Sequence, residues 1–206
     1  MSKQVQAYSN DPEAALGILQ GMPPTLPSSI RGRLTMGASG VDRWSITGPL
    51  TATERAGLER SAHLLGIVLG AAEAQQIKTA IVGLLVAFPA GGSVSGGVAA
   101  ARTAMYEAAL AGLPLWAIRR AAERVMRGEI ERDNHTFAPS PPEWAKAVQA
   151  ELRPFREQAI TIGKVLGAEV EIQRSEAEVE RRKARVAELL ATFTAAPNSG
   201  ASEVER

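Results

Sequence analysis

Residues 80–143 constrain the fold most, because they carry the pattern of three amphipathic helices with a very short link between two of them. The link is Gly112-Leu113-Pro114, in which glycine suits the end of one helix and proline the start of the next. After Pro114, apolar residues recur at positions that share one helix face: Ile118, Ala121, Ala122 and Val125. We therefore expect two helices that pack antiparallel or steeply crossed.

Further helices are indicated on both sides of this stretch. Thr51 with Glu54, and Ser140 with Glu143, have the spacing of capping boxes. Two more apolar stripes follow helical spacing, one before and one after the glycine-rich segment from Gly91 to Gly97. They are Ile77, Ile81, Leu84, Leu85 and Phe88, then Val98, Met105, Tyr106, Ala109 and Leu110. These signals predict a helical domain over residues 51–152.

Residues 1–50 are rich in breaks, and we expect a mostly irregular arm apart from a short helix after Asp11. Trp44 and scattered arginines allow an arm that orders on a partner or on nucleic acid. The favoured alternative is a tether whose Trp44 folds back on the helical core, because isolated arginines are common in polar arms. Residues 195–206 are expected to be a disordered tail.

Residues 153–194 are expected to form a long helix, separated from the domain by a kink at Pro154. A seam of apolar residues repeats every seven positions along it: Val165, Ile172, Val179, Val186 and Phe193. The second seam position is poor, since Ser175 and Arg182 occupy it. We expect a weak dimeric coiled coil, and hence a homodimer, or a helix laid along another surface; a single solvated helix is the third alternative.

The composition supports an all-α fold: a small helical bundle with an irregular N-terminal arm and a long C-terminal helix. Apolar residues make up 45% of the chain, but many are alanine, and aromatics make up only 4%. Alanine buries little area, so a thin, helix-packed core is expected. Runs of Val, Ile and aromatic residues typical of strands are scarce.

The same composition excludes several functional classes. The net charge of +1 provides no bulk attraction to nucleic acid, and a chain without cysteine forms no disulfides. With His63 and His135 as its only histidines, a zinc site is not expected. Residues 80–90 are too short to span a membrane and the N-terminus has no signal-peptide pattern, so we expect a soluble intracellular protein.

We expect no catalytic activity and no cofactor. The segment from Gly91 to Gly97 has the glycines of a phosphate-binding loop but no lysine to reach the β- and γ-phosphates. Ser95 is instead a plausible N-cap for the next helix. No nucleophile–histidine signature or paired carboxylates in a sheltered position occur.

The helix after Pro114 also carries the candidate partner-binding residues, which are Trp116, Arg120, Arg124 and Arg127. Tryptophan beside arginine is a common interface anchor, because both bury much area. The alternative, which we favour for Trp116, is that its ring packs in a second core layer under Phe137 or Trp144, since tryptophan is rarely left exposed.

Across residues 84–143 the chain resembles the phage replicative-helicase loader and inhibitor family. That family has a hydrophobic helix ending in Tyr/Phe-Pro, a helix ending in a short Leu-containing turn, an Ala-rich helix and a Phe/Tyr-Pro-Pro/Ser helix start. The matching residues here are Leu84, Leu85, Phe88, Pro89, Tyr106, Leu110, Leu113, Ala117, Ala121, Phe137, Pro139 and Glu143. They are mostly core and cap positions and cover about a third of the chain.

The resemblance implies a phage or prophage replication accessory protein, without ATPase activity, that binds a replicative helicase in the cytoplasm of a bacterial host. The alternatives are a structural oligomer built on the C-terminal helix and a helical DNA-binding or packaging protein. For the DNA-binding alternative the phosphate-contacting residues would be Arg119, Arg120, Arg124, Arg127 and Arg132. Interspersed glutamates weaken that face, so we expect contact with nucleic acid to be weak or indirect.

Overall fold

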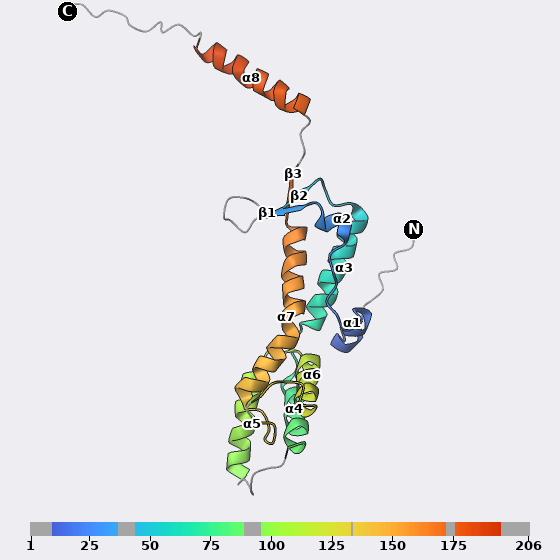
Figure 1. The fold of residues 1–206 in the computed structure, drawn as a ribbon, viewed down its shortest axis with the longest axis vertical. Coiled ribbons are helices and arrows are strands. Elements are labelled where there is room, and N and C mark those ends of the chain that lie inside the picture. The colour runs from blue at the N-terminus through green and yellow to red at the C-terminus, as the bar shows by residue number, and fades with distance from the viewer. Residues whose placement is uncertain (1–9, 37–43, 89–95, 133, 172–175, 195–206) are drawn as a thin grey trace, which may run out of the picture.

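The structure is a computed structural model that describes residues 10–36, 44–88, 96–132, 134–171 and 176–194. Eight helices and three short strands lie in the described residues (Figure 1). In chain order they are α1 (Pro12–Ile18), α2 (Ser28–Arg31), β1 (Leu34–Met36), β2 (Trp44–Thr47), α3 (Ala52–Val68), α4 (Ala74–Val86), α5 (Gly96–Leu110), α6 (Leu115–Met126), α7 (Pro141–Leu166), β3 (Glu169–Glu171) and α8 (Glu176–Thr194).

The fold is mainly helical, but the all-α expectation is corrected by a small sheet with the strand order β1-β2-β3. β1 and β2 pair antiparallel with Leu34 opposite Ile46, and β3 adds in parallel with Val170 opposite Ile46. The strands are only three or four residues long, too short to show a period of two in the sequence. The sheet joins segments from the two ends of the chain at one end of α7 (Figure 1).

The described part of the N-terminal segment is ordered structure, not an irregular arm. Asp11 caps α1 by accepting a hydrogen bond from the Glu13 backbone N–H, so the short helix expected there is present. Ile30 and Ile46 are fully buried, and Ala15 lies in the same core cluster. The N-terminal segment therefore supplies one side of the core. The expected disordered tail, residues 195–206, lies outside the described residues.

The Thr51 capping box forms as expected and is reinforced by a distant arginine. The Thr51 backbone N–H donates to Glu54 at 2.9 Å, and the Glu54 N–H donates to the Thr51 hydroxyl. Arg33 donates to both carboxylate oxygens of Glu54 at 2.7 Å. The Thr51 N–H first, and Arg33 next, lower the pKa of Glu54 to about 2. One glutamate thus caps α3 and holds the N-terminal segment to it.

α7 is the central helix, and it crosses the boundary expected at residue 152. It begins at the Ser140 capping box and packs on α3, α5 and α6. Figure 1 shows it bending part-way along without a break, although Pro154 lies inside it. Leu152 and Phe155 on either side of Pro154 are buried in the core, so packing holds the helix together across the missing hydrogen bond.

The helix expected over residues 153–194 is two helices separated by β3. α7 ends at Leu166 with Gly167 as its cap, and α8 begins at Glu176. α8 projects away from the helical body in Figure 1. None of the helices in the described part of the chain is long and apolar enough to cross a membrane.

Candidate functional site

α6 has one apolar and one charged face, as its sequence predicts. The apolar residues Ile118, Ala121, Ala122 and Val125 are buried. Gly128 follows the helix at φ +71°, a backbone conformation that glycine adopts without a Cβ clash. The turn before α6 places Gly112 at φ +74° after the end of α5, as expected, whereas Pro114 is the N-cap of α6 and Leu115, not the proline, is its first residue.

Trp116 belongs to the core and is not a surface anchor. Its side chain is only 5% exposed, and its indole N–H donates to the Val68 carbonyl oxygen at 2.7 Å. Its ring meets Phe155 edge-on, with the ring centroids 5.1 Å apart. Burial was the favoured alternative for Trp116, but its aromatic neighbour is Phe155, whereas Phe137 is half-exposed. The residue ties α3, α6 and α7 together.

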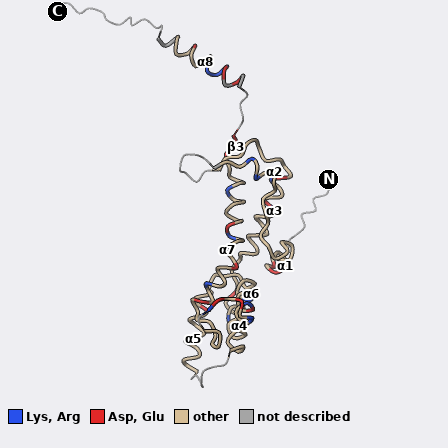
Figure 2. Tube along the Cα trace, viewed as in Figure 1, with Lys and Arg blue, Asp and Glu red and all other residues tan. Residues whose placement is uncertain are grey.

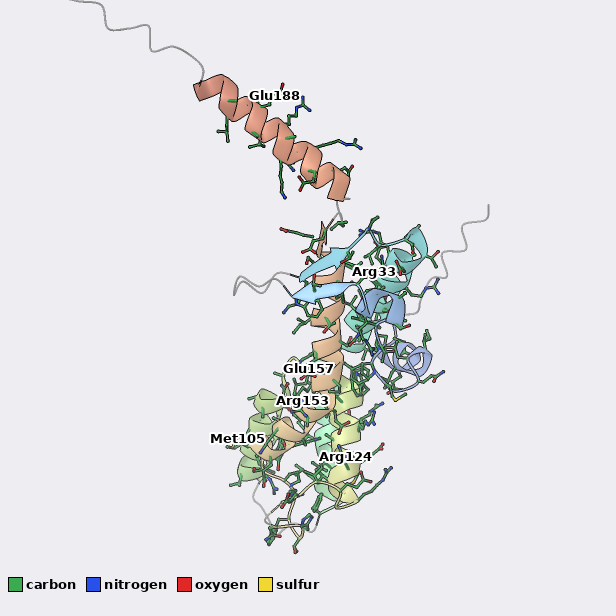
Figure 3. All side chains as sticks on the ribbon, turned by 45° about the horizontal axis from the view of Figure 1, so that its top comes forward. Arg33, Met105, Arg124, Arg153, Glu157 and Glu188 are labelled. Atoms are coloured by element: carbon green, nitrogen blue, oxygen red, sulfur yellow. The ribbon has the colours of Figure 1, made fainter. Side chains whose placement is uncertain are left out.

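Two of the other candidate residues, Arg120 and Arg124 of α6, form ion pairs with Glu151 of α7, which is 9% exposed. Arg120 lies 3.1 Å from one Glu151 oxygen, and Arg124 pairs with the other. The Glu151 carboxylate raises the pKa of Arg124, with a further contribution from Glu129. Figure 3 labels Arg124 on the side of the body formed by α6. These two guanidinium groups therefore help to hold α6 against α7.

The remaining arginines of this face are also paired. Arg127 lies 3.6 Å from both Glu123 and Glu129, and Arg119 donates to Glu13 of α1 at 2.7 Å. An open groove of about 690 Å³ runs between α1 and α6, with these groups along it. Its arginines are balanced by carboxylates, so it presents little net charge to a ligand.

This pairing weakens the DNA-binding alternative. Each of Arg119, Arg120, Arg124 and Arg127 has a glutamate within 4.0 Å. Arg132 donates to the backbone carbonyls of Asn134 and Phe137 and lies 5.7 Å from the centre of the Phe88 ring. DNA phosphates would compete with these contacts and meet the neighbouring carboxylates, which offsets part of the gain from counterion release.

Two other helices expose apolar side chains. Val82 and Val86 on α4 are 56% and 80% exposed, and Val98 and Met105 on α5 are 58% and 63% exposed. α4 and α5 pack against each other as a hairpin at the end of the body opposite the sheet (Figure 1). We call these two helices the α4–α5 hairpin.

The hairpin is also poor in charge. Its only charged residues are Lys78, Arg102 and Glu107, and Lys78 lies 3.8 Å from Glu107. In Figure 2 both helices are almost entirely tan, the colour of uncharged residues, whereas α6 and the neighbouring part of α7 carry many charges in red and blue. Exposed apolar surface of this kind is typical of protein-interaction sites, and methionine is enriched in them.

Sequence analysis placed Val98 and Met105 on the buried stripe of α5, and the structure corrects this. Tyr106 and Leu110 are the buried residues, and the Tyr106 hydroxyl donates to the Pro139 carbonyl oxygen at 2.5 Å. The signal available in the sequence was the scarcity of charge in α4 and α5. A helix with apolar residues on more than one face either lies wholly inside a core or exposes part of them.

The predicted oligomer seam is divided by the fold. Val165 is 1% exposed in the core and is removed from the seam, while Ile172 lies outside the described residues. Val179, Val186 and Phe193 all fall on α8, and Val186 is 49% exposed. Among the described residues, the rest of the seam therefore lies on one separate helix.

The described residues contain no group of three or more His, Asp or Glu side chains able to hold a metal ion. The glycine-rich segment before α5 lies mostly outside the described residues. Comparison of the chain with protein-family models, curated proteins and solved structures gives no match.

Proposed function

We propose that this chain is a phage- or prophage-encoded DNA replication accessory protein that binds a replicative helicase. It acts by binding, without ATPase activity of its own, and holds the helicase ring in a loadable or an inhibited state. The observation that carries the proposal is the exposed, nearly uncharged apolar surface of the α4–α5 hairpin.

Several of the residues that carry the family resemblance lie in the α4–α5 hairpin. Leu84, Tyr106 and Leu110 are buried, while Val86 and Met105 on the same two helices are exposed. Figure 3 labels Met105 on the side of α5 away from α6. The region of resemblance therefore includes core residues of the hairpin whose neighbours are exposed and apolar.

The hairpin is held rigidly, which favours binding. α4 packs on α6, and α5 packs on α7. The Tyr106 hydrogen bond to Pro139 and the edge-on contact of Tyr106 with Trp144, at 5.8 Å between centroids, fix α5 to the start of α7. A surface ordered before binding loses little conformational entropy when it docks.

A titration of the full chain with a purified hexameric bacterial replicative helicase tests this proposal by calorimetry. We expect affinity in the micromolar range or tighter, on the order of −8 kcal/mol or more favourable. The double variant Val86→Asp, Met105→Asp places charge in the contact and should weaken binding by at least about tenfold.

Ile160→Asp is the matched control, because it replaces another exposed apolar residue, 59% exposed, on α7 outside the hairpin. Circular dichroism establishes that all variants remain folded. Absence of heat at helicase concentrations of about 100 µM, or equal loss of binding in the control, contradicts the proposal.

A further inference from the structure

α8 carries an amphipathic pattern that the helical body does not use. Val186, Leu189 and Leu190 are 49%, 54% and 60% exposed, and the helix stands apart from the body in Figure 1. Along the sequence, Val179, Val186 and Phe193 are spaced by seven, and Leu189 lies three residues after Val186. This spacing assigns valine and phenylalanine to heptad position a, with Leu189 at position d.

The charges beside this seam suit a second copy of the same helix. With Val179 at position a, Glu178 falls at position g and Lys183 at position e. In a parallel, in-register pair, position g of one helix faces position e of the next heptad of its partner. Glu178 of each copy then comes within reach of Lys183 of the other, which also pairs with Glu180 of its own helix at 2.9 Å, so the contact between the copies is attractive and shared.

The residue types at the seam also favour two strands. β-branched residues at position a with leucine at position d are typical of parallel dimers. Arg182 occupies the other d position, and its long aliphatic chain allows the guanidinium to reach solvent from the edge of the seam. One charged d position in a helix of 19 residues makes a weak pairing, not an obligate one.

We propose that α8 pairs with α8 of a second copy of this chain as a short parallel coiled coil, giving a concentration-dependent homodimer. The pairing is independent of helicase binding, since it uses neither the hairpin nor the α6 face. It would join two bodies, each with its own α4–α5 hairpin, so that one oligomeric partner could be engaged twice.

Sedimentation equilibrium of the full chain between about 1 µM and 1 mM tests the pairing. We expect a reversible monomer–dimer equilibrium, and Val186→Asp should weaken it by about a hundredfold or more, since it places a charge in the seam. Ala184→Asp is the control, because position 184 falls at the outer f position of the same helix. It should leave the equilibrium within about threefold of the original.

Cysteine substitution tests the orientation, because the chain has no cysteine of its own. Leu189→Cys should form a disulfide-linked dimer under mild oxidation, since equivalent d positions meet in a parallel in-register pair, whereas Ala184→Cys should not. A monomer throughout the concentration range, equal disruption by both aspartate variants, or a dimer that Leu189→Cys fails to cross-link overturns the proposal.

Discussion

Replacement of Trp116 by phenylalanine separates a structural role from a partner-binding role for this side chain. The indole N–H donates to the carbonyl of Val68, the last residue of α3, at 2.7 Å. Carbonyls in the last turn of a helix have no partner within the helix, so this bond satisfies an acceptor that the helix leaves open. Phenylalanine keeps the contact with Phe155 but leaves the Val68 carbonyl unpaired.

A buried acceptor without a partner costs about 1–3 kcal/mol, and we expect Trp116→Phe to lower the free energy of unfolding by that amount. Trp116→Ala also opens a cavity, and it should cost about 3–5 kcal/mol. Either loss is measurable against a total stability of about 5–15 kcal/mol. Urea unfolding followed by circular dichroism at 222 nm measures both values.

Trp44→Phe is the matched control. The structure gives the Trp44 indole N–H no hydrogen-bond partner among the described residues, and Lys164 lies 5.8 Å from the centre of the ring, a contact that phenylalanine also allows. We expect this change to cost less than about 1 kcal/mol. Trp116→Phe with unchanged stability but lost helicase binding would refute the reasoning, because Trp116 would then be a contact residue.

Three further predictions concern charge and backbone geometry. Because the folded-state pKa of Glu54 is lowered to about 2, its stabilising contribution is complete above its ordinary value of 4.5 and is lost as pH falls towards 2. The loss of stability between neutral and acid pH, measured from urea midpoints, should be smaller in Glu54→Gln than in the original chain. Glu151→Gln removes the carboxylate that Arg120 and Arg124 share and should lower the free energy of unfolding by about 1–3 kcal/mol. Glu157→Gln, whose side chain is 69% exposed, should lower it by less than about 0.5 kcal/mol. Gly128→Ala forces alanine to φ +71° and should lower stability by about 1–2 kcal/mol, whereas Gly163→Ala, inside α7 with open space at the new Cβ, should raise it by up to about 1 kcal/mol in thermal or urea unfolding.

Local chemistry made the helices predictable. The Thr51 and Ser140 capping boxes and the apolar spacing of α6 each depend on residues within one or two turns, and all three form as expected. The sheet was not predictable in this way. Its β3 strand consists of Glu169, Val170 and Glu171, and it is a strand because it pairs with β2, more than a hundred residues earlier in the chain.

The candidate surfaces depended on tertiary packing, which periodicity does not determine. Trp116 lies beside arginines on a helix, yet its ring lies in the core, where it packs on Phe155 and its N–H hydrogen-bonds to the end of α3. Arg120 and Arg124 of α6 depend for their role on Glu151, which comes from α7. Pro154 fell inside a continuous helix because buried residues on both sides of it hold α7 together.

Amide hydrogen exchange of the full chain, measured with and without a purified hexameric bacterial replicative helicase, tests the central claim most directly. The proposal predicts that bound helicase slows exchange mainly in α4 and α5, with α6 and α8 little changed, because the exposed apolar hairpin becomes the contact surface. Protection confined to the arginine face of α6, or no change in any helix at saturating helicase, would contradict it.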